Sequence, residues 1–125
     1  MIDRREIFEG NYITDVWASA GSAFKVISLN SRTVKYGANF VCRWENILPV
    51  PLTEEILLKC KGVSQDDDCF YFLMGTIRVM LTYRHYHWNL YNLDEDCVLA
   101  MFDHLHELQN IYYWLSGKKE LEVKL

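Results

Sequence analysis

Two histidine-containing segments hold the residue types that zinc-dependent catalysis requires. The first is His106-Glu107-Leu108-Gln109-Asn110. The helix of zinc proteases carries histidines at positions i and i+4, which bind the metal from one face, but here the i+4 residue is Asn110. His104 and Glu107 share a helical face, and a hydrogen bond between them at the protein surface accounts for the pair. We therefore expect no catalytic residue and no metal ligand in this segment.

The second segment, Arg84-His85-Tyr86-His87-Trp88, places two histidines at alternate positions. On a strand, His85 and His87 would point to one side, with Tyr86 and Trp88 on the other. A zinc site needs three or four ligands, and the neighbouring sequence offers no third. The pattern favours a polar strand face backed by aromatic core residues. The alternative is a surface that contacts a partner, with Arg84, His85 and His87 as its residues, because Arg, Tyr and Trp are enriched in binding hot spots.

Asp66-Asp67-Asp68 brings three carboxylates together. Calcium-binding loops place their ligands at alternate positions and add further oxygens downstream, so this run favours a solvated acidic turn. Asp66, Asp67 and Asp68 complete the set of residues expected to bind a partner. The sequence has no nucleophile elbow, no P-loop and no G-x-G-x-x-G motif, so we expect no catalytic residue and no cofactor.

The charge of the chain is unevenly distributed. The 125 residues include 13 basic and 17 acidic side chains, for a net charge of −4, and half of the residues are hydrophobic, which excludes a disordered chain. Residues 1–62 have a net charge of +1 and residues 63–125 one of −5, so the acidic excess lies after residue 62. No run of Lys and Arg reaches three residues, which disfavours nucleic-acid binding unless the fold gathers Arg32, Lys35 and Arg43.

The four cysteines and the N-terminus bear on the compartment. Cys42, Cys60, Cys69 and Cys97 include no C-x-x-C pair, so we expect free, mostly buried thiols in a reducing compartment. The N-terminus has no apolar segment typical of a signal peptide. The longest apolar runs have the length of a strand, far from the roughly 20 residues that span a bilayer. These features predict a cytoplasmic protein with no membrane contact.

Short strands and two helices are expected to position these residues. The β-branched and aromatic stretches within residues 12–44 predict a meander of antiparallel strands, and residues 70–90 predict a second, with a hairpin turn at Gly75-Thr76. Between them, Thr53 is typical of the N-cap of a short helix over about residues 53–61. A long C-terminal helix is expected over about residues 94–116, with Asp94 as its N-cap, followed by a short terminal strand.

The apolar stripe of the predicted long helix consists of Val98, Met101, Leu105, Leu108, Tyr112 and Leu115. Its spacing is typical of a helix that packs on one face. The order of elements predicts one α+β domain over residues 1–125. In it, the long helix would cross a strongly bent antiparallel sheet or a small β-barrel.

Three segments carry a resemblance to known proteins. They are Gly10-Asn11-Tyr12-Ile13, Pro49-Val50-Pro51-Leu52-Thr53-Glu54-Glu55-Ile56-Leu57, and the stretch from Leu105-His106-Glu107-Leu108-Gln109-Asn110-Ile111-Tyr112 to Leu115-Ser116-Gly117. This set resembles a family of small uncharacterised phage and prophage proteins that combine a P-x-P-L-T-x-E-I-L segment with a C-terminal H-x-L-Q-N-x-Y…L-x-G helix. The resemblance implies an accessory role on a mobile element and transfers no catalytic or binding residue to this chain.

We therefore expect a non-enzymatic accessory protein of phage or prophage type, in the cytoplasm of a bacterial host, that binds a host or phage protein. One concrete form is an inhibitor of a bacterial defence system, such as an anti-CRISPR protein that blocks an RNA-guided nuclease. Its acidic second half suits a basic nucleic-acid channel. The alternatives are a small β-barrel nucleic-acid-binding module and a hydrolase or metal enzyme. The sequence leaves the partner and the oligomeric state open.

Overall fold

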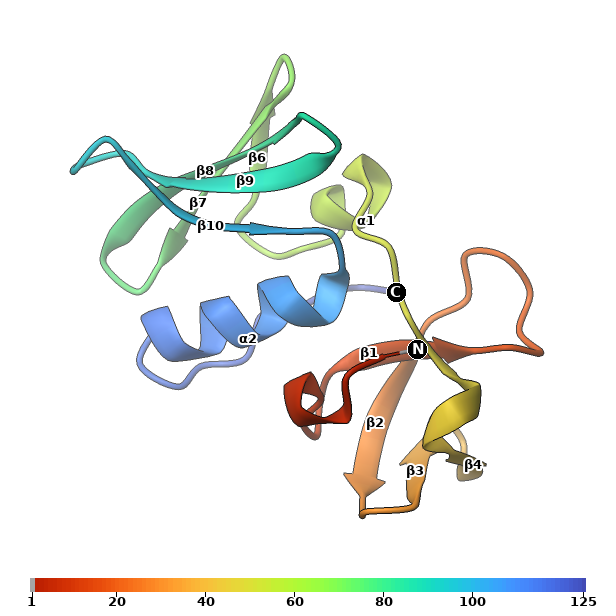
Figure 1. Ribbon diagram of the computed structural model, residues 1–125. Helices are drawn as coiled ribbons and strands as arrows, with labels where there is room; N and C mark the ends of the chain where they lie inside the picture. The colour runs from red at the N-terminus through yellow and green to blue at the C-terminus, as the bar shows by residue number, and fades with distance from the viewer. Residues whose placement is uncertain (1) are drawn as a thin grey trace. The chain divides into compact units, whose positions relative to one another are not determined.

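The computed structural model describes residues 2–125 and divides them into two compact units (Figure 1). The first unit comprises the described residues up to Pro51 together with His104–Glu107. The second comprises Leu52–Asp103 and Leu108–Leu125. The expectation that residues 1–125 form a single domain stays a prediction.

The first unit is built on an antiparallel five-stranded sheet. Its elements are η1 (Arg4–Glu6), β1 (Tyr12–Asp15), β2 (Phe24–Leu29), β3 (Thr33–Tyr36), β4 (Phe40–Arg43), η2 (Trp44–Asn46) and β5 (Ile47–Pro49). The strand order is β4-β3-β2-β1-β5. The meander predicted within residues 12–44 is therefore confirmed, because β1 to β4 pair in sequence order.

Tyr36 is at the centre of the apolar core of the first unit. Its side chain is buried, and its ring lies 5.7 Å from that of Phe24 and 5.9 Å from that of Phe40. The Tyr36 hydroxyl donates a hydrogen bond to the carboxylate of Asp15. Burial, followed by this hydrogen bond, raises the pKa of Tyr36 well above its ordinary value. Ile13, Val34 and Ile47 are among the other buried residues of this core.

The second unit is built on a second antiparallel sheet. Its elements are α1 (Glu54–Leu58), β6 (Ser64–Asp66), β7 (Cys69–Met74), β8 (Ile77–Arg84), β9 (His87–Asn92) and β10 (Cys97–Phe102), and it shares α2 (Leu105–Leu115), whose first turn belongs to the first unit. The strand order is β10-β9-β8-β7-β6. From Leu108 onward, α2 runs along one face of this sheet (Figure 1).

One face of the second sheet is buried. Side chains alternate along each strand, and Phe70, Phe72, Val79, Leu81, Trp88 and Leu90 all lie on this inner face with at most 7 % of their surface exposed. The Trp88 indole N–H donates a hydrogen bond of 2.8 Å to the Leu52 carbonyl. The Phe70 ring packs edge-on against Trp88. Trp88 is therefore held on the inner face by an aromatic contact and by a hydrogen bond.

The prediction of one long helix over residues 94–116 is wrong in its first half. Helix α2 begins at Leu105, and β10 occupies Cys97–Phe102. The Asn92 side chain accepts hydrogen bonds from the amides of Asp94 and Glu95, which closes a turn where the helix was expected to start. Asp94 binds Arg78 instead of capping a helix, at 3.0 Å between Nε and Oδ1. The chain therefore turns back and pairs with β9.

The predicted α+β class is confirmed, but the single bent sheet is not, because the strands form two separate sheets. Neither sheet closes into a barrel, since β4 and β5 are the edges of one and β6 and β10 are the edges of the other. The short helix begins as predicted, with the Thr53 hydroxyl accepting from the Ile56 amide at 3.2 Å, but it ends at Leu58. The predicted terminal strand is reduced to one bridge between Cys60 and Val123.

Gly75, in the turn between β7 and β8, is required for two reasons. Its φ of +64° is left-handed, and a Cβ there would lie 3.0 Å from the Leu115 carbonyl oxygen. We expect Gly75→Ala to lower the free energy of unfolding by about 2–3 kcal/mol, from backbone strain plus the clash. Gly62→Ala is the matched control, because its φ is +83° and nothing lies within 4 Å, so it should cost only about 1 kcal/mol. Urea unfolding measures both values, and equal losses would contradict the clash.

Candidate functional site

The residues expected to bind a partner gather at one end of the second sheet. The strand register pairs Asp66 with Cys69, Cys69 with Thr82, and Arg84 with His87. The turn between β6 and β7 therefore lies at the same end as the turn between β8 and β9. A hydrogen bond of 3.3 Å from the Thr82 hydroxyl to the Asp68 carbonyl joins the first of these turns to β8. We call these two turns, residues 66–69 and 84–87, the paired turns.

The histidines of the paired turns do not share a strand face, which corrects the sequence-based interpretation. His85 and Tyr86 have φ values of 55° and 70° and form the turn itself. Tyr86 is 86 % exposed and is no core residue, whereas Trp88 is buried as expected. The His87 imidazole contacts the Asp103 carboxylate, with 2.7 Å between Nδ1 and Oδ1. Arg84, Asp66, Asp67 and Asp68 are exposed.

The outer face of the second sheet carries a row of apolar and aromatic side chains, with Arg78 paired to Leu73 and Asn89 paired to Met101 on the same face. Strand register aligns Tyr71, Met80, Tyr91 and Val98 in one row across four strands. Leu73 and Met101 lie on the same face, beside this row. We call Tyr71, Leu73, Met80, Tyr91, Val98 and Met101 the outer patch. Leu73, Val98 and Met101 are 57 %, 52 % and 64 % exposed, and the other three side chains are half-buried. Tyrosine and methionine are both enriched at protein interfaces.

Carboxylates lie at both ends of the outer patch. Asp66–Asp68 belong to the paired turns, and Asp94, Glu95 and Asp96 belong to the turn between β9 and β10 at the opposite end. The arginines of these two ends are Arg84 and Arg78, and Arg78 is engaged by Asp94. The surroundings of the outer patch are therefore acidic, a distribution that attracts basic partners.

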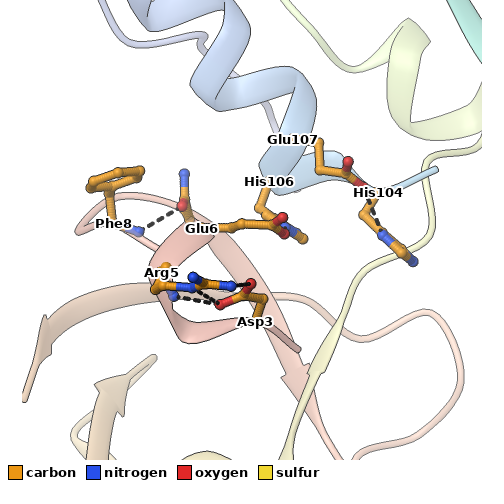
Figure 2. A network of polar contacts seen from close by, with 8 residues as sticks. Asp3, Arg5, Glu6, Phe8, His104, His106 and Glu107 are labelled. Carbon is orange, nitrogen blue, oxygen red and sulfur yellow. Dashed lines mark hydrogen bonds and ion pairs between the residues drawn. The ribbon is translucent and has the colours of Figure 1, made fainter. Parts of the chain in front are cut away.

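A buried histidine lies in the first unit, at the start of α2 (Figure 2). The His106 side chain is 1 % exposed, and its Nε2 lies 3.5 Å from Oε2 of Glu6, the last residue of η1. Its ring stacks on His104, with 5.7 Å between centroids and 9° between planes. His104 in turn contacts Glu107, with 2.8 Å between Nδ1 and Oε1. The predicted pairing of His104 with Glu107 is thus confirmed.

Burial favours the neutral form of His106. Burial lowers the pKa of its imidazole below the ordinary value of 6.5, and the hydrogen bond with Glu6 acts in the opposite direction. The Nδ1 atom of His106 has no hydrogen-bond partner among residues 2–125. In the sequence, His106 has neighbours typical of an amphipathic helix. No sequence pattern predicts its contact with Glu6, which is 100 residues away.

The groups of this cluster do not form a metal site. Within the described part of the chain, no set of three His, Cys, Asp or Glu side chains is placed to hold a metal ion. His106 is also buried. The cluster therefore supports a structural contact between η1 and the first turn of α2.

A surface hollow of about 600 Å³ lies in the second unit, where the C-terminal tail pairs with the end of α1. Cys60 and the ion pair of Lys61 with Glu122, at 3.4 Å, are part of its lining. Burial raises the pKa of the Cys60 thiol to about 11, so this sulfur is protonated at neutral pH and is a poor nucleophile.

The basic residues considered for nucleic-acid binding lie in and near the first sheet. Strand register pairs Thr33 with Arg43 and Lys35 with Val41, so Lys35 and Arg43 share a face of the β3–β4 hairpin. Glu45 Oε1 lies 3.8 Å from Arg43 Nη1 and partly offsets its charge. The closed barrel that this alternative presupposed is not formed.

Comparison of the chain with protein-family models, with curated proteins and with solved structures found no match. Among residues 2–125, the helices are too short or too polar to cross a membrane.

We predict that acid destabilises the protein through His106. The folded state holds a neutral imidazole with a lowered pKa, so the unfolded chain binds the proton more readily. The free energy of unfolding should therefore fall as the pH drops below 6.5 toward the lowered pKa. Urea unfolding at about pH 7.5 and about pH 5.5 measures this loss.

The His106→Gln variant should lose less stability on acidification than the wild type, because glutamine does not titrate in this range. His85→Asn removes an exposed histidine from a turn in which asparagine tolerates the positive φ, and it should behave as the wild type does. An unchanged acid response in His106→Gln would contradict the assignment.

The four cysteines are free and differ in accessibility, so we predict an order of alkylation. Only Cys60 is buried, contrary to the expectation that most would be, and Cys97 is exposed. Iodoacetamide should modify Cys97 first and Cys60 only after unfolding, because burial hides the Cys60 thiol and raises its pKa. Peptide mapping by mass spectrometry, with and without urea, follows each site. Early modification of Cys60 in the native protein would be inconsistent with this order.

Proposed function

We propose that this chain is a non-enzymatic binding protein of phage or prophage type that acts by covering a surface of a host or phage protein. The observation that carries the proposal is the outer patch with carboxylates at both ends. An exposed sheet face with two tyrosines and two methionines offers a large contact area, and the tyrosines contribute theirs at low entropic cost. Apolar area of this kind, inside a charged rim, is the usual anatomy of a protein interface.

The acidic rim favours a partner with a basic surface. Charge of one sign steers an oppositely charged partner and raises its association rate. The channels in which bacterial proteins bind nucleic acid are basic surfaces of this kind. Occupying such a channel would exclude the nucleic acid, so one concrete form of this function is inhibition of an RNA-guided nuclease in the cytoplasm of the bacterial host.

The chemistry of the remaining sites supports binding rather than catalysis. The Cys60 thiol is protonated at neutral pH, and His106 is enclosed. The hydrolase alternative would require a nucleophile and a base that a substrate can reach. The nucleic-acid-binding alternative would require a dense basic surface, whereas the larger exposed patch described above is acidic at its ends.

The outer patch can be tested with one matched pair of variants. Leu73→Lys puts a positive charge in the outer patch, at a side chain that is 57 % exposed, and Leu58→Lys makes the same change on α1, at one that is 55 % exposed. We expect Leu73→Lys to weaken partner binding at least about tenfold, which is about 1.4 kcal/mol, and Leu58→Lys to leave it unchanged.

Affinity capture from bacterial lysate identifies the partner. Biolayer interferometry with the purified partner then measures the affinity of each variant. If the partner is a nuclease, its cleavage of a DNA target is measured as well. Binding should also weaken as salt rises. Absence of any stoichiometric partner, or equal binding by both lysine variants, would count against the proposed function.

A further inference from the structure

The outer patch has a defined length between its two acidic ends. Strand β9 has six residues and joins the paired turns at one end to the turn of Asp94–Asp96 at the other. At about 3.3 Å per residue, the two ends are about 20 Å apart. A binding segment that satisfies both ends must place positive charges at about this separation.

The width of the outer patch favours a helix. Its central residues, Met80 and Tyr91, lie on the neighbouring strands β8 and β9 and are directly paired. Adjacent strands are about 4.8 Å apart, so a helix about 10 Å across covers these two strands and touches the flanking ones. Helix α2 from Leu108 onward already runs along one face of the same sheet (Figure 1).

A second copy of this chain does not fit the outer patch. Placing two outer patches face to face would bring the carboxylates of Asp66–Asp68 and Asp94–Asp96 of both copies to the same edges. Like charges held together at an interface oppose association, whereas lysine or arginine at those positions favours it. The charge distribution therefore selects a partner of opposite sign.

We propose that the outer patch binds an amphipathic helix of about 13 residues, with an apolar face in its middle and basic residues at both ends. This inference rests on the proposed function and specifies the partner's binding segment. Apolar side chains at positions i, i+3, i+4 and i+7 of that helix pack on Met80, Tyr91 and their neighbours. Its terminal Lys or Arg side chains face the acidic turns at the two ends of the sheet.

The test uses synthetic helical peptides and the full chain. The probe has fourteen residues, with leucines at i, i+3, i+4 and i+7 and two lysines at each end, and the control peptide carries glutamates in place of the lysines. Isotope-labelled protein reports the site by NMR. We expect the lysine peptide to shift the resonances of β7 to β10 residues of the outer patch, and to bind at least about tenfold more tightly than the glutamate peptide.

Two double variants test each acidic end. Asp67→Asn with Asp68→Asn neutralises one end, and Glu95→Gln with Asp96→Asn neutralises the other; asparagine suits the positive φ of positions 67 and 96. Each should weaken binding of the lysine peptide by about threefold. Glu54→Gln with Glu55→Gln, on α1, is the matched control and should leave it unchanged.

Equal affinity for the two peptides, shifts outside the outer patch, or no binding at about 1 mM would overturn the helix assignment. The proposed function would stand in that case if a captured partner still lost binding on Leu73→Lys. Conversely, lysine-peptide binding at the outer patch without any cellular partner would uphold the surface assignment and count against the proposed function.

Discussion

The second unit depends on the fact that, in a strand covered on one face, every second side chain points toward the cover. Trp88, Leu90, Leu81 and Phe70 satisfy this constraint on the inner face, and the Trp88 indole also finds its acceptor at Leu52. Because the inner face takes the apolar residues that the core needs, the residues at the intervening positions are free to serve another purpose. They include tyrosines and methionines, where short polar side chains would be the usual choice for a wetted surface.

How far the fold follows from local sequence can be judged at residues 92–105. Val98, Met101, Leu105 and Leu108 have helical spacing, and Asp94 is a good N-cap, so local rules favour a helix from 94 onward. The Asn92 side chain accepts from the amides of Asp94 and Glu95 and closes a turn there, and pairing with β9 outweighs helix propensity in residues 97–102. By contrast, the predictions at Thr53 and at the Gly75-Thr76 turn rest on neighbouring residues alone, and both are confirmed.

The candidate site was predictable only in part, for a similar reason. The residue types in the segments 66–68 and 84–88 mark them as unusual, but their meeting at one end of a sheet depends on the register of β7 with β8. The sequence does not predict the outer patch, because its residues are spread over four strands and each of them is of a type that is also common in cores. The partner of His106 is likewise set by tertiary structure, since Glu6 belongs to η1 at the other end of the chain.

The presence of Met80 and Met101 in the outer patch has a chemical consequence. A thioether that reaches water is open to peroxide, and Met101 is 64 % exposed. Conversion to the sulfoxide would replace a polarisable apolar group by a strong dipole in the middle of the surface, and would leave the inner core untouched. The protein would then keep its fold under oxidative stress, while the outer patch would become less apolar. Methionine sulfoxide reductases would restore the thioethers.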